Sequence, residues 1–116
     1  MWRTIGQDKA VSILQRSLDE GRLSHAYLLV GPRHVGKMTL ALDLARAVNC
    51  LEDNRPCDQC NQCLRLARRL HADLRVVGID ADESGHRRRR VAISIDQIRE
   101  VQREASLKPY EGNHRV

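Results

Sequence analysis

A glycine-rich loop between an apolar run and a helical pattern constrains the fold of this chain more than any other feature. Residues 27–30 (YLLV) have the length and composition of a buried strand, and residues 40–48 repeat apolar side chains at helical spacing. Between them, Gly31, Gly36 and Lys37 follow the G-x-x-x-x-G-K spacing of a phosphate-binding loop. In such a loop the backbone N–H groups and the helix N-terminus surround a phosphate, and the lysine reaches the terminal phosphates. The alternative is a Gly/Pro turn that precedes, by chance, a helix beginning with lysine.

The residue after the loop lysine departs from the usual pattern. A Ser or Thr hydroxyl normally holds magnesium there, whereas this chain has Met38, and Thr39 points about 100° further round the helix. Because a thioether is a poor ligand for a hard cation, we expect the loop to hold the phosphates of ATP or ADP without the usual magnesium clamp. The predicted nucleotide-contacting residues are Gly31, Pro32, Arg33, His34, Val35, Gly36, Lys37, Met38 and Thr39.

Four cysteines form a compact cluster after the helical pattern. Cys50, Cys57, Cys60 and Cys63 are spaced C-x6-C-x2-C-x2-C, with polar turn-forming residues in the gaps. The overlapping C-x2-C steps let neighbouring thiolates share one ion, and the upstream thiol completes a tetrahedral S4 site for zinc. Since no ligand position is left open, this zinc would be structural, and residues 50–63 would be a zinc-binding insertion. Disulfides and a thioredoxin-like redox pair are the alternatives.

Apolar spacing predicts further helices. One covers residues 7–20 with Gly21 as its C-terminal cap, and another covers residues 64–70. The second carries arginines on its outer face, which form either a solvated face or a contact with an acidic partner: Arg65, Arg68 and Arg69. Ser94 and Gln97 match a capping box, which opens a helix with these side chains directed inward: Ile95, Ile98, Val101 and Ala105.

Two more segments are predicted as strands. Residues 74–79 form the second strand of the chain, and residues 114–116 form the first part of another. Together with residues 27–30 they are the three strand candidates of the chain. The polar loop 80–90 contains four consecutive arginines at 87–90, which we interpret as solvated, with phosphate contact as the alternative.

Length and charge limit the class of protein. A chain of 116 residues has room for one domain, and its net charge of +5 suits an anionic partner such as a nucleotide, nucleic acid or acidic protein surface. No apolar stretch approaches the roughly 20 residues of a membrane span, and no signal-peptide pattern precedes the first helix. We therefore expect a cytoplasmic protein without membrane contact, whose cysteines are reduced or metal-bound.

Several motifs together resemble the nucleotide-binding domain of bacterial clamp-loader subunits, AAA+ proteins of DNA polymerase III. The resemblance covers essentially all 116 residues. It rests on I-G-Q at residues 5–7, S-H-A-Y-L-L-V-G-P at 24–32, G-K at 36–37, the four-cysteine insertion, H-A-D at 71–73 and I-S-I-D-Q-I-R at 93–99. The resemblance implies an α/β fold over residues 1–116: a partial P-loop AAA+ domain with a parallel sheet and flanking helices, and with the zinc-binding insertion at 50–63. The acidic Walker B strand of the family would begin near Val116, so the chain is expected to be an N-terminal fragment.

Two subunit types share this layout, and they differ at the loop. The ATP-hydrolysing gamma/tau type reads G-x-R-G-x-G-K-T, whereas this chain has His34 and Met38 at the inner glycine and the threonine. These differences favour the delta-prime type, which by resemblance joins other clamp-loader subunits in a ring that loads the sliding clamp onto primed DNA. The fragment itself is expected to lack catalysis. The alternatives are a gamma/tau ATPase and a zinc-stabilised nucleic-acid-binding module with a vestigial loop.

Overall fold

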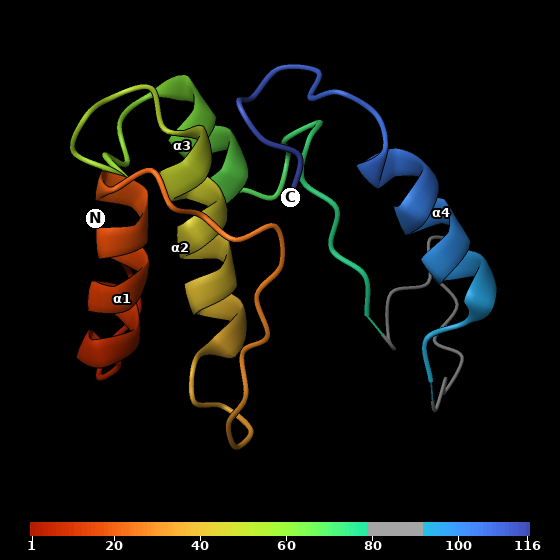
Figure 1. Ribbon diagram of the computed structural model, residues 1–116, viewed down its shortest axis with the longest axis horizontal. Helices are drawn as coiled ribbons and strands as arrows, with labels where there is room; N and C mark the ends of the chain where they lie inside the picture. Colours follow the sequence, from red (N-terminus) through yellow and green to blue (C-terminus); the bar gives the residue numbers. More distant parts are fainter. Residues whose placement is uncertain (79–91) are drawn as a thin grey trace. The chain divides into compact units, whose positions relative to one another are not determined.

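The computed structural model describes residues 1–78 and 92–116, and the chain divides into two compact units, Met1–His71 and Ala72–Val116. Three helices belong to the first unit and one to the described part of the second (Figure 1). Their bounds are α1 Asp8–Asp19, α2 Lys37–Asn49, α3 Asn61–Ala67 and α4 Ile95–Ala105. Within the described residues, none of these helices is long and apolar enough to cross a membrane.

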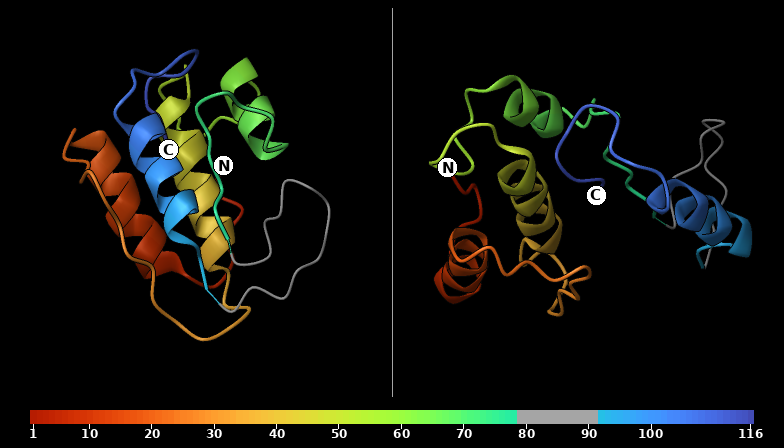
Figure 2. Two further views of the ribbon diagram at one scale, coloured as in Figure 1. Left: turned by 90° about the vertical axis from the view of Figure 1, so that its right-hand side faces the viewer. Right: turned by 45° about the horizontal axis from the view of Figure 1, so that its top comes forward.

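The first unit is built around α2, which packs against both α1 and α3 (Figure 2). Leu18 from α1 meets Ala47 and Val48 from α2 in a small core, and Trp2, Leu23 and Leu44 pack around it. The helix expected over residues 7–20 is confirmed as α1, and Gly21 follows it with a left-handed φ of 66°. The helix expected after Lys37 is confirmed as α2, which is the most buried helix of the unit.

The predicted parallel-sheet α/β fold is wrong for the described part of the chain, which is helical and contains no strand. Residues 27–30 are not a strand, and Leu28 and Val30 are 88% and 84% exposed. An apolar run becomes a buried strand only when neighbouring strands satisfy its backbone and cover its faces. The sequence pattern identified the apolar run, but within residues 1–78 and 92–116 no neighbour pairs with it.

The other two predicted strands are also corrected. Residues 74–78 lie outside any helix or strand, and Ile79 falls outside the described residues, as does the whole predicted loop 80–90 with the arginines at 87–90. Val116 donates its N–H to Asp73 O at 2.8 Å and accepts from Arg75 N at 2.9 Å. These two backbone bonds join Asp73 and Arg75 to Val116 without forming a strand.

The second unit contains α4, whose start was correctly predicted. Ser94 caps the helix, and its side chain and that of Gln97 form the reciprocal bonds of a capping box. The predicted burial of the apolar face is wrong, because α4 has no buried residue and Ile95 and Ile98 are 62% and 40% exposed. No sheet covers this face in the part of the chain that the structure describes. Ile98 and Val101 instead line an open groove of about 670 Å³ within this unit.

Candidate functional site

The four cysteines converge at the end of α2. Cys50 is the C-cap residue of α2, Cys57 and Cys60 lie in the following loop, and Cys63 belongs to the first turn of α3. Their sulfur atoms all lie within 4.8 Å of one another, and Cys50 and Cys63 are almost completely buried. All four are free thiols, so neither the disulfide alternative nor an oxidised redox pair is present.

Backbone N–H groups are directed at two of the sulfurs. The amides of Gln59 and Cys60 lie 3.4 and 3.2 Å from Cys57 Sγ, and the amide of Cys63 lies 3.4 Å from Cys60 Sγ. The bonds from Gln59 and Cys60 stabilise the thiolate and lower the pKa of Cys57 to about 6. Burial raises the pKa of Cys63, whose thiol donates to Arg46 O at 3.9 Å. The cluster therefore combines one readily ionised thiol with one that burial keeps protonated.

The donor set fits a metal ion. With metal–sulfur bonds of about 2.3 Å, a tetrahedral S4 site has sulfurs about 3.8 Å apart, so a contraction of about 1 Å at most would bring the cluster to that geometry. Four soft sulfur donors with no carboxylate or imidazole suit zinc better than magnesium or calcium. The four thiols could thus hold one metal ion with every position filled by protein.

The predicted phosphate loop forms a tight turn before α2. Gly36 is the N-cap residue with φ 99°, and His34 also has a left-handed φ of 62°. At Gly31 an added Cβ would lie 3.2 Å from Val35 Cγ1, so the turn is closely packed at its start. Lys37 Nζ donates to Gly31 O at 2.5 Å, which folds the side chain back across the loop. The loop glycines and the lysine are therefore brought together as the spacing predicts.

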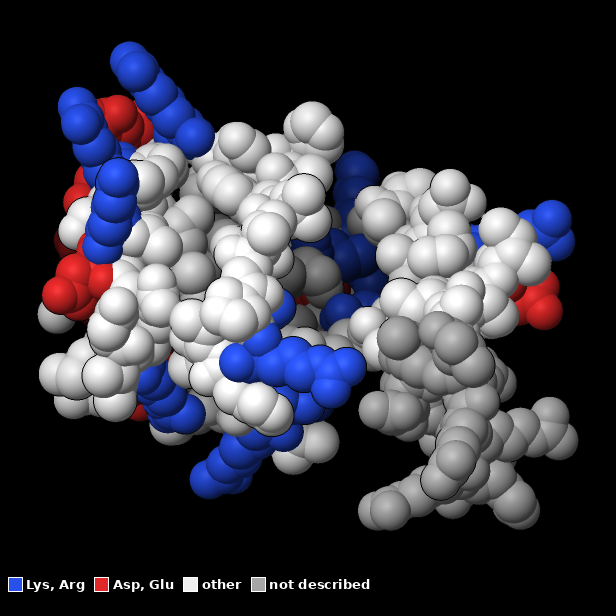
Figure 3. Space-filling model, turned by 90° about the horizontal axis from the view of Figure 1, so that it is seen from below, with Lys and Arg blue, Asp and Glu red and all other residues white. Residues whose placement is uncertain are grey.

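The other predicted loop residues lie on the outside of this turn. The side chains of Pro32, Arg33 and His34 are exposed, and Val35 is half-buried. Met38 is 48% exposed in the first turn of α2, next to the exposed Thr39. Lys and Arg side chains project at several places on the face of the first unit seen in Figure 3, while Asp and Glu gather toward one edge. Most side chains of the loop are thus accessible to solvent.

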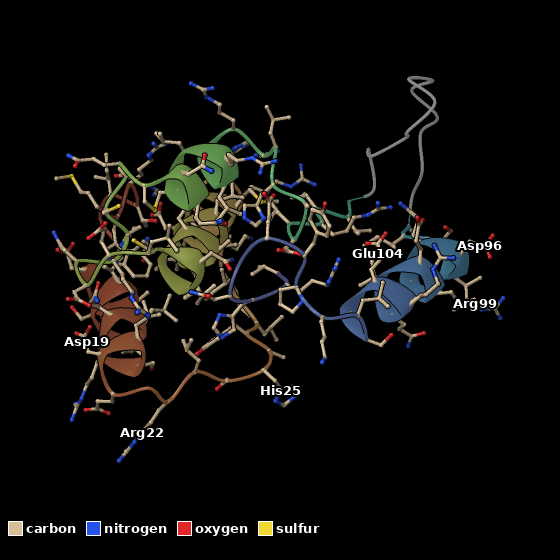
Figure 4. All side chains as sticks on the ribbon, turned by 90° about the horizontal axis from the view of Figure 1, so that it is seen from above. Asp19, Arg22, His25, Asp96, Arg99 and Glu104 are labelled. Atoms are coloured by element: carbon tan, nitrogen blue, oxygen red, sulfur yellow. The ribbon has the colours of Figure 1, made fainter. Side chains whose placement is uncertain are left out.

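His25 precedes the apolar run and was interpreted as an ordinary loop residue. It is exposed, and Figure 4 shows its side chain pointing away from the chain. The same figure shows Asp96 and Arg99 projecting outward from α4. None of these three side chains joins either candidate site.

Sequence reasoning missed a buried group of charged residues beside the cysteine cluster. Asp43 and Arg46 on α2 are each 1% exposed and form an ion pair, and Arg46 also pairs with Asp58 between Cys57 and Cys60. A signal was available in the sequence. Asp43 falls on the apolar stripe of α2, between Leu40 and Ala47, where a charged residue needs a buried partner.

Comparison with known proteins finds relatives among the subunits of DNA polymerase III. Residues 6–116 match the family model described as "DNA polymerase III, delta subunit". The gamma/tau subunit of DNA polymerase III from Mycobacterium tuberculosis (strain ATCC 25618 / H37Rv) is 35% identical over 114 residues, which are 97% of this chain and 18% of that protein. The delta' subunit from Bacillus subtilis (strain 168) is 33% identical over 111 residues, 95% of this chain and 31% of that protein. The tau subunit of the same organism is 31% identical over 114 residues, 97% of this chain and 18% of that protein. The chain spans less than a third of the length of each of these relatives.

Proposed function

Because this chain belongs to the family described as DNA polymerase III, delta subunit, we propose that it serves in a clamp-loader subunit of the delta-prime type. The observation that carries the proposal is the family match over residues 6–116. The convergent thiols directly after α2 support it, because the resemblance in the sequence includes a four-cysteine insertion at that place. Its partners would be other clamp-loader subunits, and it would reach the sliding clamp and primed DNA through their assembly.

Affinity purification from the organism's own cells tests the assembly role. The tagged gene product should bring down gamma/tau and the other clamp-loader subunits, whether or not DNA has been digested by nuclease. A tagged gamma/tau subunit from the same cells serves as the control. If the control recovers the assembly and the tagged chain recovers none of its subunits, the proposed role is wrong.

The structural cofactor proposed for the subunit is one zinc ion held by Cys50, Cys57, Cys60 and Cys63. The sulfurs already converge, and bound zinc supplies the fixed tetrahedral geometry that a short polar loop cannot obtain from a core of its own. Elemental analysis of the purified protein should find one zinc per chain. Replacing Cys60 with Ser should release the metal, whereas replacing the exposed Ser24, which is no part of the cluster, with Ala should not.

The ligand proposed for the loop is the phosphate group of ATP or ADP. Lys37 Nζ would exchange its bond with Gly31 O for a phosphate oxygen, and the first N–H groups of α2 would donate to the same group. Met38 offers no hydroxyl, so binding should depend little on magnesium. Titration with a fluorescent ADP analogue, with and without magnesium, measures this. Lys37→Ala should abolish binding, and Lys9→Ala, on exposed α1 surface, should leave it unchanged.

A gamma/tau ATPase is the second candidate, favoured by relatives of that type at 35% and 31% identity. Hydrolysis requires magnesium at the phosphates. The two candidates therefore differ in one measurement. Measured on the full-length gene product, magnesium-dependent ATP turnover that Lys37→Ala removes would favour the ATPase, and binding without turnover would favour the delta-prime type. In the second case Met38→Thr should make nucleotide binding more dependent on magnesium.

A further inference from the structure

The buried charged residues of the first unit have no part in holding either proposed ligand. Asp43 and Arg46 are each 1% exposed, and the Asp58 side chain is 26% exposed. The Arg46 guanidinium forms an ion pair with each carboxylate: Nη2 donates a hydrogen bond to Asp43, whereas Nη1 meets Asp58 Oδ1 by charge, without a hydrogen bond. A guanidinium taken out of water is retained only where opposite charges compensate it, so the two carboxylates fix its position.

Arg46 contacts the metal-binding loop in two places. Its guanidinium pairs with Asp58, the residue after Cys57. Asp58 has a left-handed φ of 62°. Its backbone carbonyl accepts from Cys63 Sγ at 3.9 Å. One residue of α2 thus contacts the loop at Asp58 and α3 at Cys63, and it lies four positions before Cys50 in the sequence.

The same network holds the N-terminal segment. Asp43 Oδ2 accepts from the backbone N–H of Arg3 and of Thr4, both at 2.9 Å, and from Thr4 Oγ1 at 2.7 Å. Arg46 donates to Met1 O at 3.3 Å. The Arg3 guanidinium lies 4.0 Å from Asp58. The N-terminal segment, α2 and the cysteine loop therefore share one set of charged contacts.

We propose that Arg46 is a positioning residue for the metal site, and that through Asp43 and Asp58 it links metal binding to the ordering of residues 3–4. The inference rests on the proposed metal binding by the four cysteines. Arg46 does not touch the ion. It holds the loop that carries Cys57 and Cys60 against the helix that ends at Cys50, so the thiols meet with less loss of chain freedom on binding. Outer contacts of this kind typically change metal affinity by about 10–100-fold.

Competition with a chromophoric chelator measures the zinc affinity of the whole chain and of four variants. Arg46→Met, which keeps an unbranched side chain without the charge, should bind zinc about 10–100-fold more weakly. Asp58→Asn should also weaken binding, and it leaves the buried pair on α2 intact if Arg46→Met fails to fold. Arg46→Lys should restore part of the affinity. Arg55→Met is the matched control, because Arg55 lies in the same loop and its bond within residues 1–78 and 92–116 is to Glu52 O at 3.2 Å, outside the Arg46 network.

Two further readouts separate positioning from general stability. Cobalt(II) bound to four thiolates gives intense visible bands, and their intensity should fall in Arg46→Met but not in Arg55→Met. In the wild-type protein, adding zinc should slow amide exchange of Arg3 and Thr4 by NMR, and Arg46→Met should remove that response.

The possible failures are distinguishable. If the wild-type chain binds no zinc, the proposed metal function fails and the inference falls with it. If the wild-type chain binds zinc and either Arg46→Met or Asp58→Asn binds it equally well, the positioning role alone is wrong. Zinc that protects Arg3 and Thr4 equally in Arg46→Met would overturn the link to the N-terminal segment.

Discussion

Asp73 is expected to be the main polar determinant of the second unit. Its carboxylate is buried and accepts from the backbone N–H groups of Tyr110, Glu111 and Gly112 at 2.6, 2.8 and 2.7 Å. The Arg115 guanidinium lies 3.5 Å away. One side chain thus holds the turn that follows α4 against the segment that begins the unit.

The cost of replacing Asp73 with Asn follows from which oxygen each donor uses. Oδ2 accepts from Glu111 and Gly112, whereas Oδ1 accepts from Tyr110 and faces Arg115. An amide keeps one of these oxygens and turns an NH₂ group toward the donors at the other. The variant loses one hydrogen bond to a charged acceptor, and the backbone N–H that made it then faces another N–H donor. Together these effects should lower the free energy of unfolding by about 2–3 kcal/mol. Asp73→Ala removes all three bonds and should cost about 4–5 kcal/mol, less than three times the single loss because water reaches the exposed turn.

Amide hydrogen exchange by NMR measures this locally. Since about 1.4 kcal/mol corresponds to a tenfold change, Asp73→Asn should speed exchange at Tyr110 by about 30–100-fold. Asp96→Asn is the control, because Asp96 is exposed in the first turn of α4 and its loss should cost less than about 1 kcal/mol. If Tyr110 exchanges within about twofold of the wild-type rate in Asp73→Asn, the carboxylate does not hold the turn as argued.

Three other changes test the first unit. His34→Gly should stabilise the protein by up to about 1 kcal/mol in urea unfolding, because a left-handed residue with a Cβ costs more than the added freedom of glycine, whereas His25→Gly should not stabilise it. Leu66→Ala should destabilise it by about 2–5 kcal/mol in the same assay, since Leu66 is 1% exposed in α3; an effect under about 1 kcal/mol would show that the site is not packed as described. In the metal-free protein, alkylation of Cys57 should rise with pH to half its maximal rate near pH 6, because the thiolate is the nucleophile and the pKa of Cys57 is lowered to about 6; a midpoint near that of a free thiol, about 8.5, would contradict this.

The candidate metal centre was predictable because its information is local. Cys57, Cys60 and Cys63 are each three residues apart, so a turn followed by a helix start brings their sulfurs together whatever the rest of the chain does. The capping box at Ser94 was predictable for the same reason, since both partners lie within one helical turn. Local spacing thus predicted the start of α4 and the convergence of the cysteines.

The sheet was not predictable from the same kind of evidence. An apolar run such as residues 27–30 indicates that the segment can form a strand, but whether it pairs with another strand depends on residues far away in the chain. The prediction supplied those neighbours from the resemblance, and the described residues do not contain them. The Arg46 network was missed for a related reason, because its contacts with Asp58 and with the N-terminal segment join residues far apart in the sequence.

The conformation of the loop bears on which change separates this chain from an ATPase. By resemblance, the hydrolysing type has glycine at the position of His34, and φ at His34 is 62°, the region that glycine prefers. The backbone therefore keeps the glycine-like turn despite the side chain, and Gly36 and Lys37 stay in place. Histidine in place of that glycine is therefore expected to change the stability of the protein more than the backbone conformation of the loop. If the loop holds nucleotide as proposed, the difference expected to matter for chemistry is Met38, which has no hydroxyl for magnesium, so Met38→Thr should change the magnesium dependence of binding while His34→Gly should not.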